Sequence, residues 1–163
     1  MKKIIYLAGG CFWGVQEYFS RLKGVYSTVS GYANGIKENP SYQEVKTGNT
    51  LSAETVEVGY DNDVISLTKI LEHYLRFVDP YSINRQGEDV GNQYRTGVYY
   101  VDDNDKEIIK KYFDEKLKVG YVIEITKLKN FYKAEEYHQD YLKKNPTGYC
   151  HVNLNLIKDD EKK

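Results

Sequence analysis

Cysteine and proline are scarce in this sequence of 163 residues, and apolar runs are short. Two cysteines are too few for a disulfide scaffold and, even with three histidines, too few for a structural zinc site. Three prolines exclude a polyproline or collagen-like architecture. The apolar run from Ile4 to Ala8 is shorter than the core of a secretory signal, and no stretch approaches the roughly 20 apolar residues of a membrane span. We therefore expect a cytoplasmic protein that has no metal centre and does not enter a membrane.

Net charge is also low. The 23 basic and 24 acidic side chains leave a formal charge of -1, which gives no electrostatic basis for binding nucleic acid or an anionic membrane. The hydrophobic fraction of 40% is typical of a globular protein and excludes wholesale disorder. The length fits one domain, which we place at residues 1–157. Residues 158–163 are predicted to form a charged, frayed tail.

The pattern of apolar residues predicts a mixed α/β fold. Helices are expected over residues 15–22, 67–78, 104–118 and 134–144, and strands over residues 3–8, 25–31, 55–60, 98–101 and 122–128. This order is typical of a two-layer sandwich in which helices cover a mixed or antiparallel sheet with a ferredoxin-like split βαβ core. Residues 79–96 lack periodicity and form a long loop of the kind that is usually functional or disordered. The segment after Pro146 is predicted to be irregular.

The junction between the first strand and the first helix reads Gly9-Gly10-Cys11-Phe12-Trp13-Gly14. Two glycines let the backbone turn sharply, and they place Cys11 at the start of the helix. Backbone N–H groups and the helix dipole at that position favour a thiolate, so the pKa of Cys11 is expected to lie below the usual value of about 8.5. Phe12 and Trp13 cannot both face the core, so at least one is exposed or lines a pocket. For Cys11 taken alone, a small buried core residue remains the alternative interpretation.

The sequence resembles the peptide methionine sulfoxide reductase A family from residue 4 to about residue 155. Besides the Gly-Gly-Cys-Phe-Trp-Gly signature, the resemblance rests on Gly31-Tyr32-Ala33, Asn39-Pro40-Ser41-Tyr42, Ala53-Glu54, Asp89-Val90-Gly91-Asn92-Gln93-Tyr94-Arg95, Ala134-Glu135-Glu136-Tyr137-His138-Gln139-Asp140-Tyr141 and Gly148-Tyr149-Cys150. It implies reduction of the S epimer of methionine sulfoxide, free or in peptides and proteins, without a metal or bound cofactor.

The resemblance assigns the chemical step to three kinds of group. Cys11 is the expected nucleophile. Glu54 matches an acid that must stay protonated near neutral pH, which requires an apolar setting that raises its pKa. Tyr42 and Tyr94 match tyrosines whose hydroxyls hold the sulfoxide oxygen, and Asp89 matches a carboxylate that orders the site.

Phe12 and Trp13 are expected to bind the methyl group of the substrate. Cys150 is the only other thiol in the chain. In the family, the cysteine of the Gly-Tyr-Cys motif resolves the sulfenic acid left on the nucleophile, and thioredoxin reduces the resulting disulfide. The resemblance thus implies one Cys11–Cys150 disulfide, thioredoxin as reductant and a monomer. A stray thiol is the alternative interpretation of Cys150.

The residues also permit other interpretations. Glu54 reads as a solvated residue of a strand edge, and Asp89 as a turn acid. The pair Leu51-Ser52 departs from the Gly-His usual in the family, which predicts a different loop shape there. His138, on a polar segment, reads by default as a hydrogen-bonded surface residue, whereas the resemblance places His138 and Gln139 next to the site without a catalytic part.

Three other functions were compatible with the sequence. A cysteine hydrolase or acyltransferase would use Cys11 with His138. A non-enzymatic module would bind apolar peptides through Phe12 and Trp13. A thiol peroxidase would accept peroxide in place of a sulfoxide.

Overall fold

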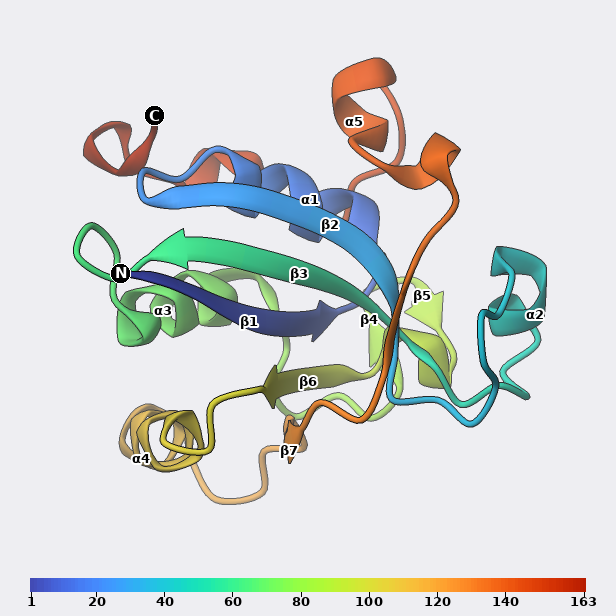
Figure 1. The fold of residues 1–163 in the computed structure, drawn as a ribbon, viewed down its shortest axis with the longest axis horizontal. Helices are drawn as coiled ribbons and strands as arrows, with labels where there is room; N and C mark the ends of the chain where they lie inside the picture. The colour runs from blue at the N-terminus through green and yellow to red at the C-terminus, as the bar shows by residue number, and fades with distance from the viewer.

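A six-stranded sheet organises the computed structural model, which describes residues 1–163 (Figure 1). Its strand order is β7-β6-β1-β3-β2-β8. The strands are β1 (Lys2–Gly9), β2 (Val25–Ala33), β3 (Ala53–Asp61), β6 (Thr96–Tyr100), β7 (Glu124–Lys127) and β8 (Phe131–Lys133). A separate two-stranded hairpin consists of β4 (Arg85–Gln86) and β5 (Asp89–Val90). The main helices are α1 (Phe12–Ser20), α2 (Tyr42–Lys46), α3 (Leu67–Phe77), α4 (Asp105–Lys116) and α5 (Tyr141–Lys144).

The four central strands form the predicted ferredoxin-like core. In the order β6-β1-β3-β2, each strand is antiparallel to its neighbours, and the chain passes through them as β1-α1-β2-β3-α3-β6. Strand β7 extends the sheet in parallel to β6, after the crossover through α4. Strand β8 pairs with the free edge of β2. The fold class expected from the sequence is therefore confirmed.

The two faces of the sheet have different cores. On one face, Ile5 and Leu7 of β1 are fully buried in the main apolar cluster, together with residues from α1, α3 and α4. On the other face, Tyr6 and Ala8 belong to a smaller cluster with Tyr99. Full burial of one large apolar side chain is worth about 1.5–3 kcal/mol, so the helix-covered face carries most of the stabilisation. Helices α1 and α3 lie behind the strands in Figure 1.

The 134–144 segment is not one helix, so that prediction was wrong. A short 3₁₀ turn over Glu136–His138 is followed by α5, and Asp140 between them has a φ of 50°, which breaks any continuous helix. The reason lies in Gln139, whose buried amide donates to Ser30 O at 2.8 Å and accepts from Ser30 N at 2.9 Å. The side chain therefore acts as a backbone partner at the edge of β2, and this contact overrides the helical spacing.

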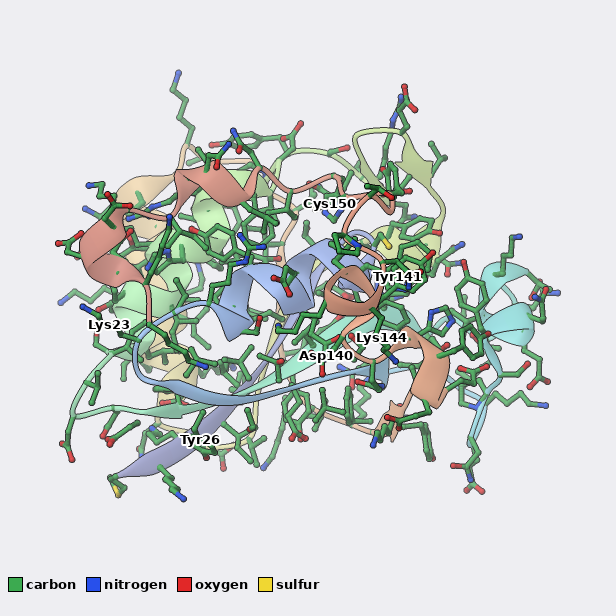
Figure 2. The ribbon with its side chains drawn as sticks, turned by 90° about the horizontal axis from the view of Figure 1, so that it is seen from above. Lys23, Tyr26, Asp140, Tyr141, Lys144 and Cys150 are labelled. Atoms are coloured by element: carbon green, nitrogen blue, oxygen red, sulfur yellow. The ribbon has the colours of Figure 1, made fainter.

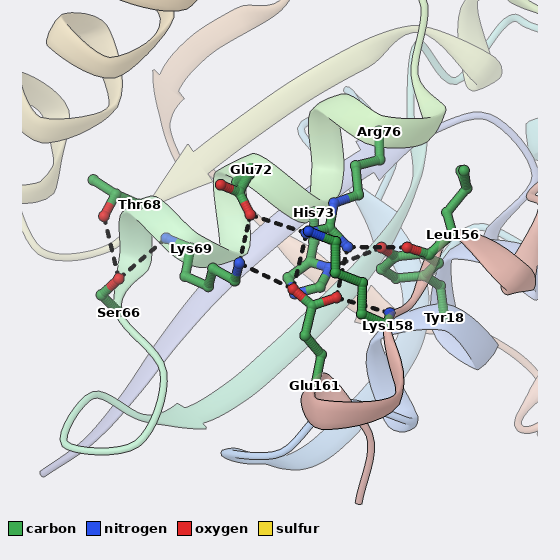
Figure 3. Close-up of polar contacts among 10 residues, drawn as sticks. All are labelled: Tyr18, Ser66, Thr68, Lys69, Glu72, His73, Arg76, Leu156, Lys158 and Glu161. Atoms are coloured by element: carbon green, nitrogen blue, oxygen red, sulfur yellow. Dashed lines mark hydrogen bonds and ion pairs between the residues drawn. The ribbon is translucent and has the colours of Figure 1, made fainter.

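The C-terminal residues 158–163 do not fray, contrary to the prediction (Figure 3). Arg76 of α3 donates to the two carboxylate oxygens of Glu161 at 2.7 and 2.8 Å, and Lys69 lies 2.9 Å from the same group. The backbone N–H of Lys23 also bonds to Glu161 O. These partners lie more than 80 positions earlier in the chain, and they hold the tail against α1 and α3.

Helix α4 is the longest helix in the structure, with 12 residues, and no helix is long and apolar enough to cross a membrane.

Candidate active site

Cys11 lies where β1 turns into α1. Strand β1 ends at Gly9, Gly10 has a φ of 88°, and Cys11 is the residue that precedes the first helical position. The turn needs glycine at position 10, because a Cβ there would lie 2.9 Å from Nε2 of His151 in addition to requiring the left-handed conformation. Cys11 is 9% exposed, so its thiol lies just beneath the surface at the start of the helix.

Glu54 of β3 reaches the same helix start. Its Oε1 accepts the backbone N–H of Phe12 at 3.2 Å, and the residue is only 2% exposed. Burial raises the pKa of Glu54 to about 8; the charge of Asp89 raises it further, while the Phe12 N–H opposes the shift. The carboxyl is therefore mostly protonated at neutral pH, in agreement with the expectation of a buried acid. Glu54 is not a solvated strand-edge residue.

The pKa of the Cys11 thiol is raised rather than lowered, so this prediction was wrong. Burial is the main cause, and Glu54, which is ionised at the high pH where the thiol would lose its proton, adds to it through its negative charge. The backbone N–H of Trp13 favours the thiolate, but one hydrogen bond at the end of a nine-residue helix does not offset the loss of water. In the ligand-free molecule, Cys11 and Glu54 are thus both held in their neutral forms.

Tyr42, at the start of α2, and Tyr94, in the short 3₁₀ turn Asn92–Tyr94, face this pair. Burial is the main cause that raises the pKa of Tyr42, to about 12, and the charges of Glu54 and Cys11 follow. Burial and the charge of Glu54 also raise the pKa of Tyr94. Both hydroxyls therefore keep their protons and are available as hydrogen-bond donors. The backbone N–H of Tyr42 donates to Glu135 at 2.8 Å, which fixes the start of α2.

Asp89 belongs to β5, in the hairpin formed by part of the 79–96 segment. It accepts a hydrogen bond from the hydroxyl of Tyr149 at 2.9 Å, and its negative charge raises the pKa values of Glu54 and Cys11. The hairpin and the short turn that carries Tyr94 account for much of the segment that lacked periodicity. These charge interactions place Asp89, Tyr42 and Tyr94 near the thiol and the carboxyl, and their roles in the reaction stay predictions.

Phe12 and Trp13 point in different directions. Phe12 is 1% exposed and belongs to the main core cluster, whereas Trp13 is only half-buried. The Trp13 indole donates to Nδ1 of His138 at 3.0 Å and stacks on Tyr141, with ring centroids 3.7 Å apart. Trp13 is thus the partly accessible member of the pair, and its ring is fixed on two sides.

Sequence reasoning gave Tyr141 no role. His138, which the resemblance placed next to the site without a catalytic part, is 1% exposed, and its ring contacts Phe12 and Tyr42 at centroid distances of 5.2 and 4.5 Å. The only local signal for Tyr141 was the density of aromatic residues between positions 137 and 141, which also fits a surface segment.

Cys150, labelled in Figure 2, lies against the first turn of α1. A Cβ placed on Gly14 would be 3.0 Å from the Cys150 sulfur, so glycine is needed for this close approach. Both cysteines are free thiols, and Cys150 is more exposed than Cys11. The two thiols therefore lie along the same turn of one helix. No group of three or more histidine, cysteine or acidic side chains is arranged to hold a metal ion.

Comparison with known proteins shows to which family this chain belongs. A family model described as peptide methionine sulfoxide reductase matches residues 3–163. The chain belongs to the peptide methionine sulfoxide reductase family. It is 55% identical to peptide methionine sulfoxide reductase MsrA of Ureaplasma urealyticum over 161 residues, which cover 97% of this chain and 98% of that protein.

Solved structures of the family agree with this fold. The reduced form of Mxr1 from Saccharomyces cerevisiae matches with a TM-score of 0.83 and 39% identity, covering 91% of this chain and 88% of that one. Mxr1 in complex with Trx2 matches with a TM-score of 0.58 and 26% identity, covering 86% of this chain and 84% of that one. The reductase fold is therefore shared across almost the whole chain.

Proposed function

We propose that this chain reduces the S epimer of methionine sulfoxide, free or in peptides and proteins, with Cys11 as the nucleophile and Glu54 as the acid. Its membership of the methionine sulfoxide reductase family supports the reaction. One observation carries the assignment of residues: a thiol and a protonated carboxyl meet at the start of α1, where the Phe12 N–H binds Glu54.

The protonation states suit the chemistry of a sulfoxide. Its oxygen must leave as water, so the oxygen needs protons while the sulfur is attacked. The Cys11 sulfur bonds to the sulfoxide sulfur as the thiol loses its proton, and the oxygen takes up this proton and the proton of Glu54 and leaves as water. Water then attacks the Cys11 sulfur, the bond between the two sulfurs breaks, and the proton released by the water returns to Glu54. The net change converts the thiol and the sulfoxide into a Cys11 sulfenic acid and a thioether. Because one proton leaves as another is delivered, the buried site gains no net charge.

The surrounding side chains fix the three substituents on the substrate sulfur. The hydroxyls of Tyr42 and Tyr94 donate to the oxygen, Asp89 orders the substrate and its water, and Trp13 with Phe12 contacts the methyl group. Burial of one methyl-sized group is worth only about 0.8 kcal/mol, so the affinity for a single side chain is weak. Discrimination between epimers follows from holding oxygen, methyl and nucleophile at three separate points.

Cys150 completes the cycle. Its thiol attacks the sulfenic sulfur of Cys11, which gives a disulfide and water, and a thioredoxin then reduces that disulfide. The position of Cys150 against Gly14 supports this role, and so does the complex of the related Mxr1 with Trx2. The cycle begins from two free thiols, which fits a reducing compartment, and we place the enzyme in the cytoplasm as a monomer with residues 1–157 as its domain.

The arrangement of imidazoles disfavours a cysteine hydrolase. Such an enzyme needs a histidine hydrogen-bonded to the thiol. Instead, Nδ1 of His138 accepts from Trp13, and Nε2 of His151 is bonded to Gly9 O. Neither ring is bonded to Cys11.

The test is an assay on separated S and R epimers of a methionine sulfoxide peptide. The wild type should reduce only the S epimer, and Cys11→Ser should lose activity even with excess dithiothreitol. Cys150→Ser should retain one turnover and dithiothreitol-driven activity but lose activity driven by thioredoxin. Equal rates on both epimers, or full thioredoxin-driven activity in Cys150→Ser, would contradict the proposal.

A further inference from the structure

His151 ties the segment that carries Cys150 to the strand end that carries Cys11. Its Nε2 lies 2.8 Å from the carbonyl oxygen of Gly9. A carbonyl only accepts, so Nε2 carries the proton and donates it. Burial lowers the pKa of His151, which keeps the ring neutral near pH 7 and fixes this tautomer. The bond joins two residues 142 positions apart.

The same three-residue segment contacts both sides of Cys11. The His151 ring lies against Gly10, where a Cβ would meet Nε2 at 2.9 Å. Cys150 and Val152 lie against Gly14, where a Cβ would meet each of them at 3.0 Å. Residues 150–152 therefore lie across the junction between β1 and α1, and the two glycines provide the space.

The packing of residues 150–152 against Gly10 and Gly14 places the sulfur of Cys150 near the sulfur of Cys11. Residues three apart at the start of a helix have Cβ atoms about 5–6 Å from each other, so Cys150, in contact with position 14, lies about one helical turn from Cys11. A disulfide requires the two Cβ atoms to be about 3.8 Å apart. The Cys150 side chain therefore needs a movement of only a few ångströms, provided that its backbone stays in place.

We propose that His151 is a positioning residue that holds Cys150 beside Cys11 for the resolving step. This inference rests on the proposed function, in which the Cys150 thiol attacks the Cys11 sulfenic acid. In that step, the S–O bond of Cys11 breaks and the S–S bond forms. The oxygen leaves as hydroxide and combines with the Cys150 proton as water. His151 exchanges no proton or electron.

Few other contacts can replace the hydrogen bond from His151 to the Gly9 carbonyl. The Cys150 thiol bonds only within its own segment, to Val152 O at 3.1 Å. The neighbouring Tyr149 is 45% exposed and is bonded to Asp89 on the hairpin, which is not part of the β1–α1 junction. Without the His151 bond, the segment can adopt more conformations, and an intramolecular attack slows as the reactive geometry becomes rarer. Val152, which is buried, still limits the movement, so the expected loss is about ten-fold rather than complete.

Single-turnover kinetics without reductant separate the two chemical steps. Wild type, His151→Ala, His151→Gln and His151→Asn are mixed with the S epimer and quenched over time. Methionine reports the first step, free-thiol counts report the disulfide, and dimedone traps sulfenic acid. Asn155→Ala is the matched control, since its exposed side chain lies shortly after residues 150–152, in the 3₁₀ turn Leu154–Leu156, and makes no hydrogen bond.

In His151→Ala and in His151→Asn, whose shorter amide cannot reach Gly9, methionine formation should stay within two-fold of wild type. Disulfide formation should slow about ten-fold in both, and trapped sulfenic acid should accumulate. His151→Gln should recover most of the rate, because its amide N–H can donate to Gly9 O. Asn155→Ala should match wild type. Thermal unfolding of each variant checks that it is folded.

Two results would overturn the inference. One is an unchanged rate of disulfide formation in folded His151→Ala and His151→Asn. The other is an equal loss in methionine formation, which would place His151 in the first step. A failure of the proposed resolving role is seen separately, since Cys150→Ser would then still recycle fully with thioredoxin.

Discussion

The buried acid predicts a dependence of stability on pH that can be measured without any substrate. The folded protein holds the Glu54 proton up to about pH 8, whereas the unfolded chain releases it near the ordinary pKa of 4.5. The unfolded state is therefore favoured increasingly as the pH rises between these values. Glu54→Gln keeps the shape of the side chain and its acceptor for the Phe12 N–H but cannot ionise, so the variant should lack this component.

The size of the effect follows from the pKa shift. A displacement from 4.5 to about 8 corresponds to about 5 kcal/mol at high pH, since each pKa unit is worth about 1.36 kcal/mol. Between pH 5 and pH 8, linkage gives a loss on the order of 3 kcal/mol for the wild type relative to Glu54→Gln. Any difference in baseline stability between the amide and the carboxyl, from unmatched hydrogen bonds, does not vary with pH.

Urea denaturation of both proteins at pH 5, 6, 7 and 8 measures this difference. Other groups with shifted pKa values, among them the three buried or half-buried histidines, titrate in both proteins and cancel in the comparison. The free energy of unfolding of Glu54→Gln minus that of the wild type should increase steadily as the pH rises. If the two curves run parallel from pH 5 to pH 8, Glu54 has an ordinary pKa and cannot be the acid of the reaction.

Three further substitutions test other parts of the structure. Leu51 is 46% exposed with a φ of 56°, so Leu51→Gly should raise the free energy of unfolding by about 0.5–1 kcal/mol, and an unchanged or lower melting temperature would contradict strain at this position. Gly14→Ala should displace Cys150 and slow disulfide formation more than methionine formation in single-turnover kinetics; an equal effect on both steps would argue against this contact. Glu161→Gln should lower the free energy of unfolding by about 1–2 kcal/mol at pH 7, because Arg76 holds the pKa of that carboxyl below its usual range. Since a lowered pKa stabilises only above the ordinary value, this loss should shrink below pH 4.5 in denaturation curves, and a loss independent of pH would rule out the ion pair as its cause.

The helices and strands that could be predicted are those whose own residues carry a complete apolar pattern. Strand β1 is a continuous apolar run, and α3 carries a full apolar stripe with a Ser66 cap, so both were located within about two residues. Helix α2 has only five residues, too few for a periodic pattern, and it was not predicted. Its capping box between Ser41 and Glu44 was the one local signal that could have located it.

The candidate site was predictable in its membership but not in its electrostatics. Family motifs identified Cys11 and Glu54, and the structure brings them together. The position of Cys11 before a helix predicted a lowered thiol pKa, yet burial and Glu54, which depend on distant segments, raise it. The local pattern around His138 favoured a surface position for a similar reason, since its partner Trp13 lies 125 positions away in the chain.

The contacts that define the site have a consequence for synthesis on the ribosome. The Phe12–Glu54, Trp13–His138 and Gly9–His151 bonds span 42, 125 and 142 positions, so the nucleophile emerges early while most of its partners emerge last. A nascent chain that stops before residue 138 contains Cys11 but lacks His138 and Tyr141, which contact Trp13, and it also lacks Cys150. Contacts this distant in sequence form late in folding, and competence for catalysis should therefore appear only after the end of the chain is released.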